Sequence, residues 1–486
     1  MSAEFISRLQ FAFTVLFHMT FPAFTIGLSI YLSVMYGMYW RTHKLVYYQV
    51  FKFFRKIFAV GFALGVVAGI VITFQFGLNW GVYGAKTGPI LGPIIGMEVV
   101  SAFFVEATFL GVLLYGDGKV SERLMFISSV LVAIGTVSSS TWILIANSWM
   151  QTPAGFKMDA AGRFVPANWW HIIFNPSFGI RWCHIIVGVL ITASVLVMGI
   201  AAYFVVKHSD DPELFRFGKR SVSIGLGIMA ILIPIQMSIG DTVALNYVAK
   251  DQLSSNGLPS KLAAMEGHWE AGSSYIIVAW PSNKEEKNLF EIAVPHLGSV
   301  IAMKDFSGKS KILGMKQIPK AERPWVWAVF GGFRMMYYGA ITLLATAFIG
   351  LILRLRGKLF TSKKYMKWLL FISPAGFLAV WGGWITAEAG RQPWVVWGQL
   401  ATKDAASHIS TAEVMYTLSV FLIIYLTLII AYIMYIVRTT KKGPDSLADI
   451  AKLLGHQDGE FIKKAVPQLT DAAENDTQND SKGGPA

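Results

Sequence analysis

Long runs of apolar residues, separated by short polar segments, recur along most of the chain. Many of these runs have about 18 or more residues without a charge, which is the length a helix needs to cross the hydrocarbon core of a bilayer. Hydropathy predicts about nine such helices, at residues 10–38, 57–78, 90–116, 124–148, 180–206, 221–240, 326–353, 368–388 and 411–437. The pattern predicts an all-α polytopic membrane protein.

Two segments depart from this pattern. Residues 241–325 form one long loop with strand-like pieces such as SSYIIVAW, and the polar residues at the C-terminal end finish in DAAENDTQNDSKGGPA, a composition typical of disorder. We therefore divide the chain into transmembrane helices over 1–240, a loop over 241–325, transmembrane helices over 326–437 and a largely disordered polar tail over 438–486.

Charge distribution predicts the orientation of the chain. Charged residues make up only 15% of the sequence, against about 25% in a soluble domain. The net charge of +13 comes largely from lysines and arginines in alternate short loops, such as residues 41–56 and 354–367. The positive-inside rule then places the N terminus on the periplasmic side and the C terminus on the cytoplasmic side. The excess charge therefore indicates topology, and no nucleic-acid partner is expected.

Ionisable residues inside spanning helices are costly, so each is a functional candidate. The predicted spans hold few of them: His18, Glu98, Glu106, His184, Arg334 and Glu388. At about 1.5 Å per residue, most of these, together with Met336, lie in the outer half of the membrane. Glu106 lies about 12 Å further in than Glu98, on a broadly similar helix face.

Isolated histidines, a methionine and an acid at similar depth suggest haem ligation. A His/Met pair on low-spin haem raises its potential, and His184 with Met336 could form such a pair across two spans. Arg334, two residues earlier, could meet a haem propionate, while His18 and Glu388 could each hold a further iron. Other interpretations remain open: a lone histidine can join helices by hydrogen bonds, a methionine can face lipid, and an acid at a span end can be an interfacial anchor.

The eighth span ends in WITAEAGRQPW, residues 384–394. Arg391 lies about one turn beyond Glu388 and could offset carboxylate or propionate charge, because a guanidinium stays protonated. Trp384 and Trp394 fit an interfacial aromatic belt, in which case they would be simple lipid anchors.

Several segments together resemble subunit I of the cytochrome bd family of quinol oxidases. They are SRLQFAFTVLFH (7–18), FQFGLNW (74–80), GMEVVSAFFVEATF (96–109), WILIANSWMQTP (142–153), RWCH (181–184), KLAAMEGHWE (261–270), FRMM (333–336) and WITAEAGRQPW (384–394). The resemblance covers essentially all nine spans, and GRQPW is a hallmark of the family.

The resemblance implies three haems: a low-spin haem b, a high-spin haem b and a haem d. It makes His184 and Met336 the axial ligands of the low-spin haem, and assigns His18 to the oxygen-reducing haem and Glu388 to the high-spin haem b. Glu98 resembles the acid beside that site, and Glu106 the proton-path acid. The residues expected to meet haem propionates or to support the site are Arg8, Arg334, Trp384 and Arg391.

Lys261 and Glu266, in KLAAME, match the family's quinol-binding pair, so residues 241–325 resemble its periplasmic quinol loop. The loop lacks a C-terminal insertion found in some members and is similar to that of the cyanide-insensitive branch, where a b-type haem can replace haem d. The resemblance also implies a partner subunit II, in some members a small single-span subunit, and ubiquinol or menaquinol and oxygen as substrates.

The expected function is that of a terminal quinol oxidase in the bacterial inner membrane. It would oxidise quinol at the periplasmic side and reduce oxygen to water with cytoplasmic protons, generating proton motive force without a proton pump. A non-oxidase dihaem electron carrier and a secondary transporter are the alternatives. Buried acids also fit a transporter, although transporters usually show internal repeats and the sequence shows no convincing one.

Overall fold

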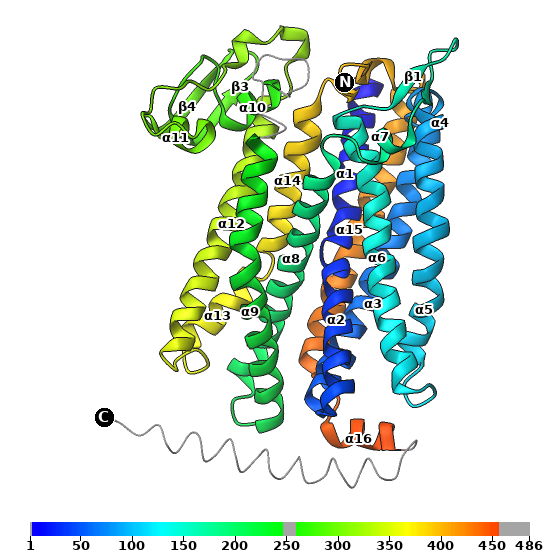
Figure 1. Cartoon of the computed structure of the whole chain (residues 1–486), viewed down its shortest axis with the longest axis vertical. Coiled ribbons are helices and arrows are strands. Elements are labelled where there is room, and N and C mark those ends of the chain that lie inside the picture. The colour runs from blue at the N-terminus through cyan, green and yellow to red at the C-terminus, as the bar shows by residue number, and fades with distance from the viewer. Residues whose placement is uncertain (1, 246–258, 456–486) are drawn as a thin grey trace.

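The computed structural model describes residues 2–245 and 259–455, which form a bundle of long helices with a smaller lobe at one end (Figure 1). Within these residues, nine helical segments are long and apolar enough to cross a membrane. Their bounds are Ala3–Thr42, Leu45–Gly77, Gly81–Tyr115, Glu122–Gln151, Phe178–Lys207, Pro212–Val243, Val326–Leu355, Lys363–Arg391 and Thr411–Lys442. The predicted fold class, an all-α polytopic membrane protein, is confirmed.

Six spans are single helices, and three are interrupted. The single helices are α3 (Leu45–Gly77), α6 (Glu122–Gln151), α8 (Phe178–Lys207), α9 (Pro212–Val243), α12 (Val326–Leu355) and α15 (Thr411–Lys442). The interrupted spans are α1 (Ala3–Thr20) with α2 (Pro22–Thr42), α4 (Gly81–Glu98) with the π-helical η1 (Val99–Phe103) and α5 (Phe104–Tyr115), and α13 (Lys363–Ile372) with α14 (Ala375–Arg391). Two of the interruptions lie at Pro22 and Pro374, because proline has no N–H to continue a helix.

Short elements cap the bundle. Three antiparallel strand pairs are β1 (Phe156–Met158) with β2 (Phe164–Pro166), β3 (Tyr275–Ser282) with β4 (Lys287–Val294), and β5 (Trp394–Val396) with β6 (Leu400–Ala401). The short helices are α7 (Trp169–Ile173), α10 (Pro259–Glu266), α11 (Leu297–Met303), η3 (Met315–Gln317), η4 (Lys320–Glu322), η5 (Thr402–Asp404) and α16 (Leu447–Gly455). The strand-like SSYIIVAW is thus largely β3.

The long loop and the polar tail are described only in part. Residues 246–258 of the loop and residues beyond 455 of the tail lie outside the described residues, so the disorder expected of the tail stays a prediction there. The described part of the tail contains α16, which the sequence pattern did not predict. Leu447, Ile450 and Ala451 are buried on this amphipathic helix, and Asp445 just before it pairs with Lys52 of α3 at 3.0 Å.

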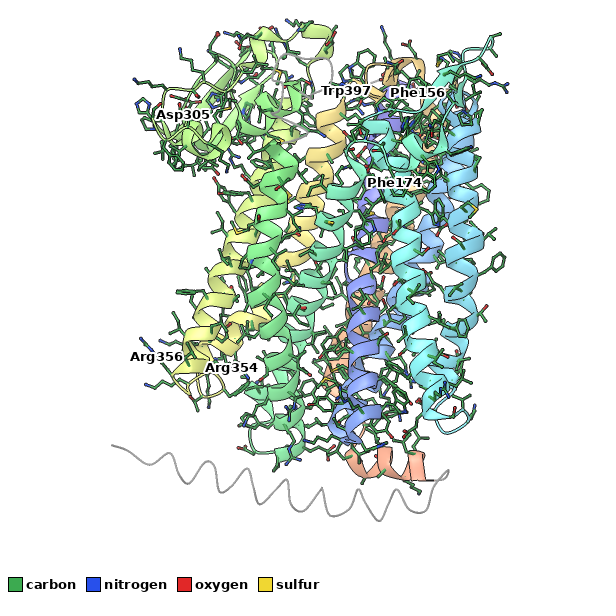
Figure 2. All side chains as sticks on the ribbon, in the orientation of Figure 1. Phe156, Phe174, Asp305, Arg354, Arg356 and Trp397 are labelled. Atoms are coloured by element: carbon green, nitrogen blue, oxygen red, sulfur yellow. The ribbon has the colours of Figure 1, made fainter. Side chains whose placement is uncertain are left out.

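The two ends of the bundle differ in character. Figure 1 places the N terminus and the lobe formed by residues 259–325 at one end, which we call the loop end. Figure 2 shows Arg354 and Arg356 at the opposite end, which we call the basic end. Residues 354–367, one of the loops rich in lysine and arginine, lie at this basic end. The folded lobe lies at the other end of the bundle.

Small residues let the helices approach closely around α8, the most buried spanning helix. A Cβ at Gly27 of α2 would clash with the carbonyl oxygen of Val189 on α8, and one at Gly382 of α14 would clash with that of Gly332 on α12. Close backbone approach at small residues is how membrane helices gain packing without a hydrophobic driving force. The result is a tight group of α8, α9, α12 and α14, whose members pack on one another.

Candidate functional site

The four candidate iron ligands lie on four different helices: His18 on α1, His184 on α8, Met336 on α12 and Glu388 on α14. Glu388 is three residues from the loop-end terminus of α14, and His184 is six residues from that of α8. Within the part of the chain that is described, His18, His184 and Glu388 each have hydrogen-bond partners of their own, and no hydrogen bond joins any two of the four candidates. The site is therefore built from separate donors spread across the bundle.

The imidazole of His18 is fixed by α3. Its Nδ1 lies 3.0 Å from the carbonyl oxygen of Gly65. Because a carbonyl can only accept, Nδ1 of the neutral ring carries the proton and Nε2 keeps its lone pair. Gly69, one turn further along α3, faces the same ring, and a Cβ there would lie 3.2 Å from Cε1. The ring is thus held in the tautomer that can ligate iron through Nε2.

His184 is held by Gln236 of α9. Gln236 Nε2 lies 3.2 Å from Nδ1 of His184 and donates to its carbonyl oxygen at 2.9 Å, while Gln236 Oε1 is buried without a hydrogen-bond partner. Exchanging the two amide atoms would let Oε1 accept from Nδ1–H and leave the lone pair of His184 Nε2 free to ligate a metal, at the cost of the bond to the carbonyl. In that orientation Gln236 would accept from the ring N–H that does not face the metal, as the second partner of a metal-binding histidine usually does.

Met336 directs its sulfur toward α14, where a Cβ at Gly383 would lie 3.0 Å from Sδ. His184 on α8 and Met336 on α12 therefore belong to the same group of four helices, since α8 and α12 both pack on α9 and α14. A glycine lies beside both of these residues. Gly383 lies beside Met336, and Gly240 of α9 lies beside His184, where a Cβ would be 3.1 Å from Cε1.

Glu388 is the centre of a polar network at the loop end. Its carboxylate forms a close ion pair with Arg391, one turn away. From α6, Asn147 Nδ2 donates to Glu388 Oε1 at 3.0 Å and Gln151 Nε2 donates to the same oxygen at 3.3 Å. Four residues separate Asn147 and Gln151, so one face of α6 supplies both amides. The carboxylate is therefore bound by charge-assisted hydrogen bonds on two sides.

Two more cations join this network. Arg181 of α8 donates to the side-chain oxygen of Asn147, and Lys261 of α10 donates from Nζ to Gln151 Oε1 at 3.1 Å. Sequence analysis assigned Lys261 to quinol binding and gave Arg181 no role of its own. Arg181 lies three residues before His184, about one helical turn, which is the signal that could have identified it.

The network holds more positive than negative charge. Arg181, Arg391 and Lys261 surround the single carboxylate of Glu388, and Arg391 Nε is buried without a hydrogen-bond partner. Burial, reinforced by nearby Arg181, lowers the pKa of Lys261 to about 7. The arrangement can therefore accept further anionic groups, whose charge would offset the excess.

Arg334 is held by the lobe. It donates to the backbone oxygen of Ile276 from Nε at 3.0 Å and from Nη2 at 2.7 Å, and it pairs with Glu266 at 3.4 Å. Both side chains of the pair are buried. Lys261 and Glu266, expected as one quinol-binding pair, thus have different partners: Gln151 and Arg334, respectively.

Arg8 and Trp384 occupy different environments. Arg8 pairs with Glu4 at 3.8 Å, and its side chain is 39% exposed. Trp384 is only 8% exposed, and its Nε1 is buried without a hydrogen-bond partner. The interpretation of Trp384 as a lipid anchor is therefore wrong, because the indole packs in the core with Trp80, Tyr83 and Trp149.

Glu98 and Glu106 both face α6. Ser139 donates to Glu98 Oε1 at 2.7 Å, and a Cβ at Gly135 would clash with Cγ of Glu106. Gly135 and Ser139 are four residues apart on one face of α6. In a regular helix, a separation of eight residues would rotate the two acids by about 80° from each other, but the π-helical η1 between them absorbs about one residue. The structure therefore brings both acids to one face.

The family described as "Cytochrome bd terminal oxidase subunit I" matches residues 6–444. The chain is 32% identical to "Cytochrome bd ubiquinol oxidase subunit 1" of Bacillus subtilis (strain 168), over 92% of this chain and 95% of that protein. It is 29% identical to "Cytochrome bd-II ubiquinol oxidase subunit 1" of Escherichia coli (strain K12), over 91% of this chain and 97% of that protein.

Among solved structures, the bd oxidase from Geobacillus thermodenitrificans superposes with a TM-score of 0.81, covering 91% of this chain and 99% of that chain at 24% identity. This likeness shows that the two chains share their fold. The family match extends through all nine spans and across most of the lobe. The chain therefore belongs to the cytochrome bd terminal oxidase subunit I family.

Proposed function

We propose that this chain is the haem-bearing subunit of a quinol oxidase that reduces oxygen to water. Family membership supports a terminal quinol oxidase subunit and implies haem cofactors. The observation that carries the proposal is the Glu388 network, in which three cations surround one carboxylate among candidate iron ligands. A transporter would also hold buried acids, but it has no need of histidine and methionine side chains that can ligate iron.

The residues present fit haem. A porphyrin supplies four nitrogen ligands of its own, so one or two protein donors per iron are enough, which suits donors spread over four helices. His18 offers a free Nε2, and the excess positive charge near Glu388, with the unpaired Arg391 Nε and Trp384 Nε1, suits propionates. When bound, haem supplies the one-electron transfers and the iron at which oxygen is reduced.

We assign His184 and Met336 to a low-spin haem b, and His18 and Glu388 to a high-spin pair. That pair would be a high-spin haem b with haem d, or with a b-type haem in its place, as the short loop suggests. A carboxylate such as Glu388 is a hard anionic donor suited to ferric iron. Its ion pair with Arg391 and bond from Asn147 would fix its orientation.

Quinol oxidation is assigned to the lobe. Glu266 would accept a proton as quinol is oxidised, and Lys261 would orient the head group by donating a hydrogen bond. The pKa of Lys261, lowered by burial to about 7, makes this donation dependent on pH near neutrality. The relatives are named ubiquinol oxidases, and we propose ubiquinol or menaquinol as the substrate.

Protons for oxygen reduction are assigned to Glu106 and Glu98. Both acids face one stripe of α6, and Glu106 is closer to the basic end. Glu106 is 5% exposed, and its Oε1 is buried without a hydrogen-bond partner, so this oxygen is open to a proton or to a water molecule that brings one. We place the loop end and N terminus in the periplasm and the basic end in the cytoplasm. Proton uptake from the cytoplasm would then generate proton motive force without a pump.

We propose that the chain works in the inner membrane with a second membrane subunit, subunit II, and with a small single-span subunit as in some members of the family. Much of the surface of α15 is apolar and open, with only 11% of its most apolar stretch buried within this chain. Such a surface would face lipid or another subunit.

The function is tested with the purified complex and a quinol as the only reductant. We expect oxygen consumption together with haem absorption bands, measured with an oxygen electrode and a visible spectrum. Haem bands without oxygen consumption would instead identify an electron carrier, and a colourless complex would contradict the haem assignment altogether.

Replacing Met336 with leucine tests the low-spin ligand. Because the thioether raises the haem potential, Met336→Leu should lower it by on the order of 100 mV or convert the haem to high spin. The measurement is a redox titration of the reduced-minus-oxidised spectrum. Met335→Leu, one residue away, is the matched control and should leave spectrum and potential unchanged. An unaltered spectrum in Met336→Leu rules out the ligand.

Replacing Glu106 with glutamine tests proton delivery. Glu106→Gln keeps the side-chain shape but cannot carry a proton, so oxygen consumption should fall about a hundredfold. Haem content per protein, measured in the same preparation, should stay normal. Thr108→Val on the same helix, at an exposed position, is the control and should remain active. Near-normal turnover in Glu106→Gln would dismiss the relay.

The pH dependence of quinol binding tests Lys261. The ammonium is present below about pH 7 and is lost above it, so the KM for quinol of the unsubstituted complex should rise between pH 6 and pH 8. Lys261→Met should raise the KM about tenfold at pH 6 and flatten this rise. Lys316→Met removes an exposed lysine of the same lobe and should keep the original profile. An identical profile in Lys261→Met would remove it from the quinol site.

A further inference from the structure

The lobe carries a set of exposed apolar side chains, which we call the lobe apolar face: Val278, Trp280, Phe290, Ile292, Val294 and Phe306. These side chains are between 37% and 86% exposed. Val278 pairs with Ile292 across the β3–β4 hairpin, so the two share a face. Trp280 on β3 and Phe290 and Val294 on β4 are exposed in the same hairpin; its register shifts on either side of the Val278–Ala279 segment, so exposure and not strand alternation groups them. Large exposed apolar surfaces mark protein or membrane contacts.

Phe306 projects from a well-fixed turn. Asp305 accepts hydrogen bonds from the backbone N–H groups of Ser307 at 2.9 Å and Ser310 at 2.8 Å, and its own N–H donates to Ser299 at 3.1 Å. These bonds hold the pKa of the Asp305 carboxyl well below its usual range. Phe306, next to this aspartate, is 86% exposed. The hydrogen bonds of Asp305 therefore hold the turn in a conformation that leaves the ring of Phe306 on the surface.

The turn and the hairpin form one surface. His296 follows β4 after a single residue, and its Nδ1 lies 3.1 Å from the carbonyl oxygen of Gly308. Val294 at the end of β4 and the Phe306 turn are therefore neighbours through this contact. At the other edge, the rings of Trp280 and Trp327 lie 5.9 Å apart, which continues the surface onto the first turn of α12.

Two spanning helices fix the level of this surface. A hydrocarbon core of about 30 Å needs about 20 helical residues. With Arg220 of α9 at the basic-end boundary of the core, the loop-end boundary lies near Asp241. Asp241 pairs with Lys304 at 2.8 Å, and Lys304 is two residues before Phe306. Counted from Arg354 on α12, the boundary falls near Arg334.

The hairpin is attached at that same level of α12. Arg334 donates to the backbone oxygen of Ile276, and Tyr338 donates to that of Ile277 at 2.6 Å. Val278, the next residue of β3, belongs to the lobe apolar face. The face therefore begins at the hydrocarbon boundary on one helix and its Phe306 turn reaches the boundary on another.

Figure 1 shows α11 and β4 extending sideways beyond the loop-end termini of α9 and α12, and Figure 2 places Asp305 at the outer edge of this overhang. Lysines flank the turn at 304, 309 and 311, and all three are exposed. An aromatic tip with surrounding lysines at the hydrocarbon boundary is the composition of an interfacial membrane anchor, since lysine heads reach the phosphate level.

We propose that the lobe apolar face docks into the phospholipid of the leaflet at the loop end, with Phe306 entering the boundary between head groups and acyl chains. The lobe is then held between the bundle and the bilayer surface. This inference rests on geometry alone and is independent of the function proposed above.

The test labels a cysteine at position 306. Phe306→Cys in the purified complex carries a bimane probe and is reconstituted into nanodiscs of equal parts phosphatidylcholine and phosphatidylglycerol, with or without a nitroxide on the acyl chain near the head group. Fluorescence should fall about threefold with the nitroxide lipid and resist aqueous iodide. Comparing discs with and without nitroxide cancels any absorption by other groups.

Two controls accompany the measurement at position 306. Lys320→Cys is the matched position: its side chain is 77% exposed and pairs with Glu286 near the turn between β3 and β4, so its probe should respond to iodide and not to the lipid. The unsubstituted complex reports labelling of Cys183. Ile292→Cys repeats the measurement if Phe306→Cys does not fold. A Phe306 probe quenched by iodide and not by lipid overturns the proposal, and so does a probe shielded from both, which would mean a protein partner.

Discussion

The cost of placing charge away from water is the constraint on which the loop end depends. A buried ion that loses its partner destabilises a protein by about 3–5 kcal/mol, and a membrane offers no water to replace the partner. Glu388 meets this constraint through Arg391 and two amides of α6. Lys261 meets it by a hydrogen bond to Gln151, and Arg181 by hydrogen bonds to Asn147 and to the hydroxyl of Ser148. The network therefore depends on every member and retains an excess of positive charge.

The same constraint ties the lobe to the bundle. Lys261 and Glu266 lie five residues apart on the short helix α10, and each is buried against a different partner, Gln151 of α6 and Arg334 of α12. The stem of Lys261 also lies where a Cβ at Gly390 would clash. Moving α10 would break both polar contacts at once, so the lobe and the Glu388 network are energetically coupled. A site on the lobe is thereby held in fixed relation to the spanning helices.

Composition and periodicity predict much of this fold, because each apolar run must satisfy its own backbone by forming a helix. They also single out His18, His184 and Glu388 as candidate ligands, because charged or titratable residues inside such runs are rare. They do not identify Arg181, since an arginine at the end of a span looks like any boundary charge until its bond to Asn147 is known. The rotation of each helix about its own axis decides which side chains meet between helices. The apolar runs do not determine this rotation.

The acid pair shows how much depends on that rotation. Eight residues separate Glu98 from Glu106, a spacing that in an uninterrupted α-helix would direct the two side chains about 80° apart. One π-helical turn removes most of that angle, and the two acids then meet Ser139 and Gly135 on a single face of α6. Nothing in VVSAF marks it as π-helical, because a π-turn is unfavourable locally and persists only where tertiary contacts favour it. The proton path that we propose needs aligned groups, and this local departure from regular structure is what aligns the two acids.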